Sequence, residues 1–463
     1  MSDALMEHGE LNLRRQHRQF AYEVLARMTK ALTMSRNEIS SCREHALRAA
    51  IHHARERSGW HGARLAHVDL KANFEQMLAA IPIMTKRDLI MNWNHIITSP
   101  DLDLLACQTH AEGLGCEPNY LNERYTVVKS GGSSGNPCVI AYDWDELAIM
   151  WASATRWYLQ WHSPPKRGAT RIGAVGADRA MHATAALRSI FASPFTTNAS
   201  FPVTEGFASG IVNLQRFQPD ILIGYPSAIR FFASAALKGD LFISPRVIIT
   251  TSEILMPEAR RVFKSAWTCL VVDTYGVSEF GNVAHGCGHC DAMHVNEDLF
   301  VIEPVDSAYR PIPAGTQSNS VLITALHPAR LLPLFRYEIT DRVILQEESQ
   351  SCPCGSNFQQ IGKVHGRSDD IFHYGGVAIH AHVFESVFGQ FANILEYRVV
   401  QKSNGIIVDV HVDGHFEPQS LADALRLALG RAGFHGANIE IRSVPEVERT
   451  NLGKLRRFVA MTP

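Results

Sequence analysis

The first candidate for chemistry in this 463-residue chain is a loop rich in glycine and serine. Residues 125–140 read YTVVKSGGSSGNPCVI, so the loop lies between two β-prone runs. Glycines let backbone amides approach an anion, and serine hydroxyls add donors for phosphate oxygens. It is not a Walker A loop, because the terminal Gly-Lys-Ser/Thr is missing. A flexible surface turn is the alternative to a polyphosphate site at Ser130, Gly131, Gly132, Ser133, Ser134 and Gly135.

Four of the nine cysteines lie in two tight pairs and indicate a metal site. Three of these thiols and one imidazole make a Cys₃His set that suits tetrahedral zinc, namely Cys287, His294, Cys352 and Cys354. All four ligands would come from the protein, so the zinc would be structural. Reduced free thiols are the alternative. Other possible ligands are Cys290, His285 and His289.

Composition favours a protein that acts on small molecules. The formal net charge is -2, from 44 Lys and Arg against 46 Asp and Glu, so no nucleic-acid-binding surface is indicated. The N-terminus lacks the layout of a signal peptide, and no stretch approaches the roughly 18 to 20 apolar residues of a membrane span. We therefore expect a soluble, cytoplasmic protein without nucleic-acid or membrane partners. Its length implies at least two domains.

The elements that must position these residues alternate between strand and helix. An amphipathic helix is expected at residues 17–34. From about residue 125, apolar runs at 171–175, 221–223, 246–250 and 269–272 alternate with helical stretches, which is typical of an α/β domain.

A different pattern follows residue 341 and predicts a small α+β domain. A hairpin is expected from residues 394–401 and 406–412, joined through Asn404-Gly405, a dipeptide that tolerates the positive φ of a tight turn. A helix that starts at Pro418 and a strand at 439–444 complete this domain, from about 369 to 463.

Four further motifs follow the Gly/Ser loop, at residues 274–279 (TYGVSE), 333–337 (PLFRY, leading to Asp341), 366–370 (GRSDD) and 449–454 (RTNLGK). In this order, the five motifs together resemble the adenylate-forming superfamily of acyl-CoA synthetases. The phenylacetate-CoA ligase branch is the most similar, and the resemblance covers the chain from about residue 81. The branch is indicated by residues 81–89 (IPIMTKRDL), 296–298 (NED) and 352–355 (CPCG).

The resemblance implies a fold and an activity. The expected fold is a large multi-subdomain α/β domain (1–368) with ATP and acyl sites, followed by a small mobile C-terminal α+β domain (369–463) with the catalytic lysine. The expected enzyme joins a carboxylic acid, expected to be an aryl acid, to the α-phosphate of ATP, releases pyrophosphate, and passes the acyl group to coenzyme A. Because two anions must meet, charge neutralisation and positioning carry most of the catalysis.

The resemblance also implies roles for particular residues. Lys454 would bridge the carboxylate and the α-phosphate, Glu279 would hold Mg²⁺ as an oxygen ligand, and Ser278 would lie near them. Asp341 would accept both ribose hydroxyls, and Asp369 would be the hinge. The remaining nucleotide-binding positions are Ser252, Glu253, Asp273, Thr274, Tyr275, Gly276 and Arg367. The acyl pocket would include Tyr225, Pro226 and Gly276, and some members of the branch carry a zinc site of the kind described above.

Several alternatives stay open. Asn136 stands where many relatives have a lysine, which weakens the expected phosphate site. The acceptor could be the phosphopantetheine of an acyl carrier protein, or an amine, and the non-enzyme alternative is a catalytically silent nucleotide-binding scaffold. A homodimer is compatible with the sequence. An aromatic acid is favoured by aromatic residues near the family's acyl pocket, at 157–161, 201 and 231–232.

Overall fold

Helices precede the first strand of the chain in the computed structural model. The model describes residues 2–130, 138–161, 168–176, 182–193, 195–347, 352–367, 370–391, 393–450 and 453–461. The N-terminal helices are α1 (Ser2–Ala31), α2 (Arg36–Arg57), α3 (Gly59–Arg64), α4 (Phe74–Ala80), α5 (Lys86–Ile96) and α6 (Leu104–Gly113). The expected amphipathic helix is confirmed but begins earlier, and α1 packs along α7 (Trp144–Trp161) through Ala21, Val24 and Met28.

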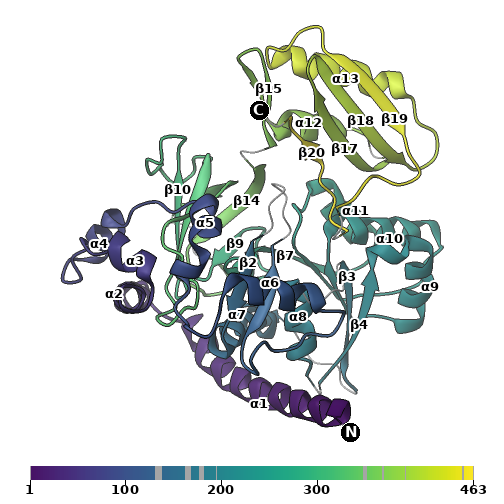
Figure 1. Cartoon of the computed structure of the whole chain (residues 1–463). Helices are drawn as coiled ribbons and strands as arrows, with labels where there is room; N and C mark the ends of the chain where they lie inside the picture. Colours follow the sequence, from purple (N-terminus) through teal and green to yellow (C-terminus); the bar gives the residue numbers. More distant parts are fainter. Residues whose placement is uncertain are drawn as a thin grey trace.

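A long mixed sheet forms the centre of the described structure (Figure 1). Its order is β13-β14-β9-β8-β7-β6-β5-β3-β4. The parallel part contains β3 (Thr170–Gly176), β4 (Thr196–Pro202), β5 (Ile221–Gly224), β6 (Val247–Thr250) and β7 (Leu270–Val277). The antiparallel part adds β8 (Gly281–Gly286), β9 (Met293–Val295), β13 (Asp341–Leu345) and β14 (Gln360–Arg367). The predicted α/β architecture is confirmed.

The parallel strands are connected through helices, so their carboxyl ends lie at one edge of the sheet. These connecting elements are α8 (Ala183–Ile190), η1 (Val203–Glu205), α9 (Phe207–Phe217), α10 (Pro226–Lys238) and α11 (Pro257–Ala266). The segments after β5, β6 and β7 contain Tyr225, Ser252 and Ser278. The topology therefore gathers these three predicted site residues at one edge of the sheet.

Smaller sheets flank this one. The strands β1 (Thr126–Lys129) and β2 (Val139–Tyr142) pair antiparallel on either side of the Gly/Ser loop, with Lys129 opposite Val139. A second small sheet contains β10 (Phe300–Val305), β11 (Ser320–Ala325) and β12 (Tyr337–Ile339). Among the described residues, every helix is too short or too polar to cross a bilayer.

The C-terminal part has a hydrophobic core of its own, built from residues between Phe372 and Phe458. Figure 1 places it, in green to yellow, above the edge of the long sheet. Its elements are β15 (Phe372–Tyr374), β16 (Val377–Ile379), α12 (Ala381–Phe388), β17 (Ile394–Lys402), β18 (Gly405–Val412), α13 (Pro418–Arg431), β19 (Asn438–Ser443) and β20 (Phe458–Val459). Four of the strands form a sheet in the order β19-β18-β17-β20.

The predicted hairpin is present, but the expected role of its glycine is wrong. Strand β17 pairs with β18, and Lys402 lies opposite Gly405. Gly405 therefore starts a strand, and neither it nor Asn404 has a positive φ. A Cβ atom on Gly405 would lie 1.9 Å from the carbonyl oxygen of Asn438 in the neighbouring strand. Close approach of two backbones, not turn geometry, requires glycine here.

Candidate active site

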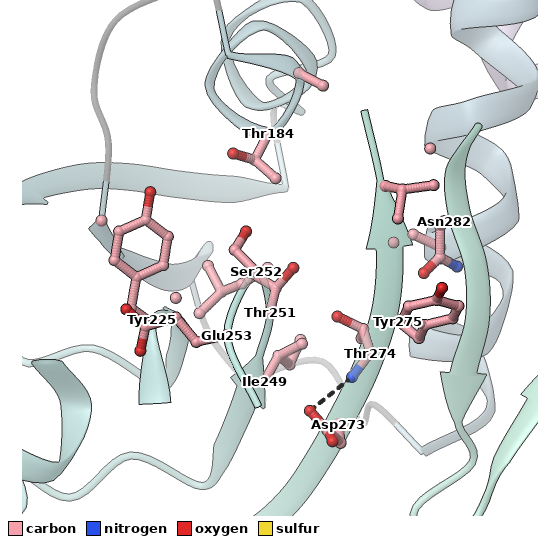
Figure 2. A pocket seen from close by; sticks show the side chains of 18 of the residues that line it. Thr184, Tyr225, Ile249, Thr251, Ser252, Glu253, Asp273, Thr274, Tyr275 and Asn282 are labelled. Carbon is pink, nitrogen blue, oxygen red and sulfur yellow. Dashed lines mark hydrogen bonds between the residues drawn. The ribbon is translucent and has the colours of Figure 1, made fainter. Parts of the chain in front are cut away.

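A cavity of about 1350 Å³ lies where the carboxyl ends of the parallel strands face the C-terminal part. It brings together predicted site residues from Ser130 to Lys454. Figure 2 shows part of its lining, between Thr184 and Asn282. The predicted site residues that line it are Ser130, Tyr225, Ser252, Glu253, Asp273, Thr274, Tyr275, Gly276, Ser278, Glu279, Asp341, Arg367 and Lys454. Predicted residues that fall outside the described residues are Gly131, Gly132, Ser133, Ser134, Gly135 and Asp369.

Strand β7 supplies Asp273 and Thr274 at the start of the TYGVSE motif. One carboxylate oxygen of Asp273, Oδ1, accepts hydrogen bonds from the Thr250 hydroxyl (2.5 Å) and the Thr274 amide (3.1 Å). Burial raises the pKa of Asp273 to about 6, while the bond from Thr250 opposes that rise. The Thr274 hydroxyl donates to the Thr250 carbonyl at 2.8 Å. These contacts fix the ends of β6 and β7 to each other at the cavity.

Asp341 lies between an aromatic ring and a guanidinium group. Its Oδ2 atom accepts a hydrogen bond from the Tyr275 hydroxyl at 3.0 Å, and its Oδ1 atom accepts one from Nε of Arg367 at 2.9 Å. Burial raises the pKa of Tyr275, and the charge of Asp341 raises it further, so the phenol stays protonated and donates. Each carboxylate oxygen has two lone pairs, so Asp341 can still accept from a ligand hydroxyl.

Glu279 is a buried carboxylate on the turn after β7. Burial raises its pKa, and the positive charges of Lys86 and Arg367 oppose that rise. The Glu279 carbonyl accepts a hydrogen bond from Arg330, and the Ser278 carbonyl accepts one from the Tyr142 hydroxyl. These two contacts fix the backbone of the turn, so the side chains of Ser278 and Glu279 line the cavity in fixed positions.

Lys86 is a cavity residue that the sequence reasoning missed. It lies in the first turn of α5, where Thr85 and Asp88 form a reciprocal capping box. The signal was available, because Lys86 belongs to the IPIMTKRDL segment that indicated the family branch. The sequence analysis used that segment to indicate the family branch and did not predict a site residue in it.

Lys454 reaches the cavity from a loop near the C-terminus. We call residues 449–455 the lysine loop; 451 and 452 lie outside the described residues. Gly453 has a φ of +70°, and a Cβ atom there would lie 2.1 Å from a methyl carbon of Val203. Burial lowers the pKa of Lys454, and the nearby carboxylates of Glu253, Glu279 and Asp341 oppose that effect. The ammonium group is thus surrounded by the acidic residues of the site.

The cavity brings together only some of the residues predicted for the acyl pocket. Tyr225 and Gly276 line the cavity, but Pro226 is the buried first residue of α10 and does not. Of the expected aromatics, Tyr158 lines the cavity, whereas Trp157, Phe201 and Phe232 belong to hydrophobic cores. Residue type alone cannot tell which way a ring faces. Side chains that do line this end, from α7, α8 and β8, include Met150, Ala154, Thr184 and Asn282.

The predicted metal ligands meet outside the strand-end motifs. One ligand atom from each of Cys287, His294, Cys352 and Cys354 lies within 4.8 Å of every other; we call this set the Cys/His cluster. The Cys287 and Cys352 sulfurs are 3.5 Å apart, close to the roughly 3.8 Å edge of a tetrahedron with Zn–S bonds of about 2.3 Å. Nδ1 of His294 donates to the Phe358 carbonyl at 3.1 Å, which leaves Nε2, 3.4 Å from the Cys354 sulfur, as the ligand atom. This donor set fits tetrahedral zinc.

Cys290 remains a competing ligand. Its sulfur lies 3.7 Å from that of Cys287 and 3.6 Å from that of Cys352. Nδ1 of His285, by contrast, donates to the Gly286 carbonyl, and the His285 ring lines the large cavity. The geometry therefore leaves one alternative thiol and gives His285 a different environment.

Comparison with known proteins identifies relatives in sequence and in fold. No family model matches the chain. It is 24% identical to a phenylacetate-coenzyme A ligase of Thermus thermophilus over 61% of this chain and 63% of the relative. It is 28% identical to a phenylacetate-coenzyme A ligase of Pseudomonas putida, over 49% and 52% of the two chains, and 25% identical to protein CapK of Staphylococcus aureus, over 53% and 54%. The chain thus spans between about half and five eighths of the length of these relatives.

Solved structures share the fold over more of the chain. A crystal structure of 2-hydroxyisobutyryl-CoA ligase in the postadenylation state matches with a TM-score of 0.71 and 16% identity, covering 94% of this chain and 91% of the other. An anthranilate CoA ligase bound to anthranoyl-AMP matches with a TM-score of 0.52 and 17% identity, covering 72% and 65%. These matches confirm the resemblance that the motifs indicated: the chain is similar in sequence to phenylacetate-coenzyme A ligases and shares the fold of acyl-CoA ligases that form an adenylate.

Proposed function

We propose that the chain is an AMP-forming acid–thiol ligase. A carboxylate oxygen attacks the α-phosphorus of ATP and pyrophosphate leaves; the thiol of coenzyme A then attacks the acyl carbon, and AMP leaves. The observation that carries the proposal is the single cavity shared by Asp341, Glu279 and Lys454. Those three side chains come from segments 62 or more residues apart, and each suits one part of the reaction.

The roles follow from the chemistry of each group. Lys454 neutralises the approaching carboxylate and α-phosphate, which otherwise repel each other. Asp341 accepts the ribose hydroxyls while Tyr275 and Arg367 hold its two oxygens. Glu279 would hold Mg²⁺, which neutralises phosphate charge when bound. Lys86 lines the same cavity and adds positive charge, which compensates for Asn136 in the expected phosphate loop.

The large and small parts of the chain are proposed to move about Asp369. The separate hydrophobic core of the C-terminal part supports a boundary at 368/369. The fold is more similar to 2-hydroxyisobutyryl-CoA ligase in its postadenylation state (TM-score 0.71) than in its thioesterification state (0.60). This supports the interpretation that the present arrangement, with Lys454 in the cavity, is the one in which the adenylate is made.

The acid and the acceptor are finer proposals. The mostly apolar lining from α7 and α8 supports a compact hydrophobic acid, and we propose an aryl acid. Coenzyme A is the proposed acceptor because it is the thiol substrate named for the relatives and neighbours. An acyl carrier protein or an amine acceptor would use the same first half-reaction. The Cys/His cluster is proposed to hold one structural zinc ion.

Exchange of labelled pyrophosphate into ATP tests the proposal. Purified protein is assayed with a panel of aryl and alkyl acids, and the products formed with coenzyme A, a carrier protein and an amine are identified by mass spectrometry. We expect acid-dependent exchange and an acyl-CoA product. ATP binding without exchange for any acid would instead support the silent scaffold.

A further inference from the structure

Glu253 connects three segments that lie far apart in the sequence. It follows β6, and its carboxylate was expected to contact the nucleotide. In the structure, Oε1 accepts a hydrogen bond from the Leu455 amide at 2.8 Å, and Oε2 accepts one from the Ser227 amide at 3.3 Å. Ser227 lies in the first turn of α10, where backbone amides have no partner inside the helix. One carboxylate thus joins the large part of the chain to the residue that follows Lys454.

Arg449 holds the other end of the lysine loop. Its Nη1 atom donates to the Ser227 hydroxyl at 3.2 Å and to the Gly453 carbonyl at 3.0 Å. Its Nη2 atom donates to Glu396 on β17, and this ion pair is buried, with side-chain exposures of 7% and 4%. The loop is therefore anchored immediately before and after Lys454. Both anchors converge on the start of α10.

The charge of Glu253 also acts on Lys454. Among the charged groups facing the ammonium, Glu253 has the largest effect that raises its pKa; Glu279 and Asp341 act in the same direction, and Arg367 opposes them. Burial lowers the pKa of Lys454 more than any single one of these charges. Glu253 therefore supports both the position and the protonated state of this lysine.

We propose that Glu253 is a positioning residue that docks the lysine loop for adenylate formation and releases it for thioester formation, and that it is not primarily a nucleotide ligand. The inference rests on the proposed function. Its contact to Leu455 crosses between the two parts of the chain, so it breaks when the C-terminal part rotates away, whereas its contact to Ser227 lies within the large part. A residue of this kind contributes to the first half-reaction alone.

Separate assays of the two half-reactions test this role. Glu253→Ala removes both contacts, and Glu253→Gln keeps one acceptor oxygen but loses the charge. We expect Glu253→Ala to lower kcat for pyrophosphate exchange by about 100-fold, as for a misplaced catalytic group, and to leave acyl transfer from preformed adenylate to coenzyme A unchanged. Glu253→Gln should retain part of the exchange activity. The matched control is Glu448→Gln, whose side chain is 69% exposed and lies beside Arg449 in sequence.

Two kinetic results would overturn the proposal. Equal slowing of both half-reactions would assign Glu253 a general structural role. A raised KM for ATP with unchanged kcat would assign it to nucleotide binding. The pH profile adds a third check: because Glu253 raises the pKa of Lys454, Glu253→Gln should shift the alkaline decline of exchange activity to lower pH. An unmoved profile would contradict this charge effect.

Hydrogen–deuterium exchange measures the docking without any turnover. Peptides that cover residues 446–458 should exchange faster in Glu253→Ala than in the parent or in Glu448→Gln, since the Leu455 amide loses its acceptor. Equal exchange in all three would overturn the docking contact even in an active enzyme. If no acid supports pyrophosphate exchange in the parent while the peptides still show this difference, the proposed function fails and the docking contact stands.

Discussion

The cavity and the Cys/His cluster are built in opposite ways. In the cluster, His294 donates a hydrogen bond from one ring nitrogen to a carbonyl, and the four ligand atoms lie within 4.8 Å of one another. In the cavity, Asp341, Glu279 and Lys454 come from separate segments and line an opening. A closed ligand set can stabilise a fold, whereas an open set of charges can receive substrates. The two regions should therefore respond differently to substitution: the cavity through activity, and the cluster through stability.

Lys454→Ala should give the largest effect. It should impair the chemistry of the cavity and leave the stability of the fold unchanged. Without the ammonium group, no positive charge offsets the repulsion between the carboxylate and the α-phosphate. The rate of adenylate formation should therefore fall about 1000-fold. Thermal unfolding should match the parent, because the side chain is half-buried and no hydrogen bond from its ammonium group holds the described structure together. Transfer from preformed adenylate is the internal control. Equal exchange rates in variant and parent would remove this role from Lys454.

Cys354→Ser should disrupt the Cys/His cluster and leave the cavity residues in place. Removal of a structural zinc ligand should lower the free energy of unfolding by about 3 kcal/mol and release the metal. Metal analysis of the parent should give about one zinc per chain. Cys290→Ser is the matched variant and should keep its zinc, since Cys290 lies outside the four-ligand set. The reverse pattern, zinc loss with Cys290→Ser only, would exchange the two thiols in the ligand set.

These two regions also differ in how far the sequence predicts them. Residue type and close spacing identify the candidate ligands of the cluster, although they leave Cys290, His285 and His289 as competitors. The strand-end motifs are similarly local: TYGVSE begins inside β7, which places it at the cavity. Long-range contacts are different. The hydrogen bond from the Leu455 amide to the Glu253 carboxylate joins residues 202 positions apart, and no local sequence pattern predicts it.

Errors of prediction share a physical cause. Trp157 and Phe232 have the residue type of an acyl-pocket lining, but burial in a core satisfies an aromatic ring equally well. Gly405 has the residue type of a hairpin turn, but its neighbour across the sheet explains it. In each case the amino-acid type was informative, but tertiary packing determined what the residue does in the fold.

Lys86→Met should sharpen the comparison by changing the charge in the cavity without altering its framework. Lys86 lies on the surface of the same cavity and lowers the pKa of Glu279. Its loss should slow pyrophosphate exchange about tenfold and raise the pKa of Glu279, since burial then acts with less opposition. Glu279 must be ionised to hold Mg²⁺, so the acidic decline of activity should move to higher pH. An acidic limb at the same pH would show that Lys86 does not act on Glu279.

Tyr275→Phe should have the smallest effect, because it removes one hydrogen bond and keeps the ring. The Tyr275 hydroxyl donates to Oδ2 of Asp341, while Arg367 still holds Oδ1. A single hydrogen bond is worth about 1 kcal/mol, which corresponds to roughly fivefold in the KM for ATP with kcat nearly unchanged. Tyr275→Ala serves as the control, since it removes the ring as well and should raise KM further. If the two variants behave alike, the hydroxyl carries the whole contribution of Tyr275, and its ring does not bind adenine.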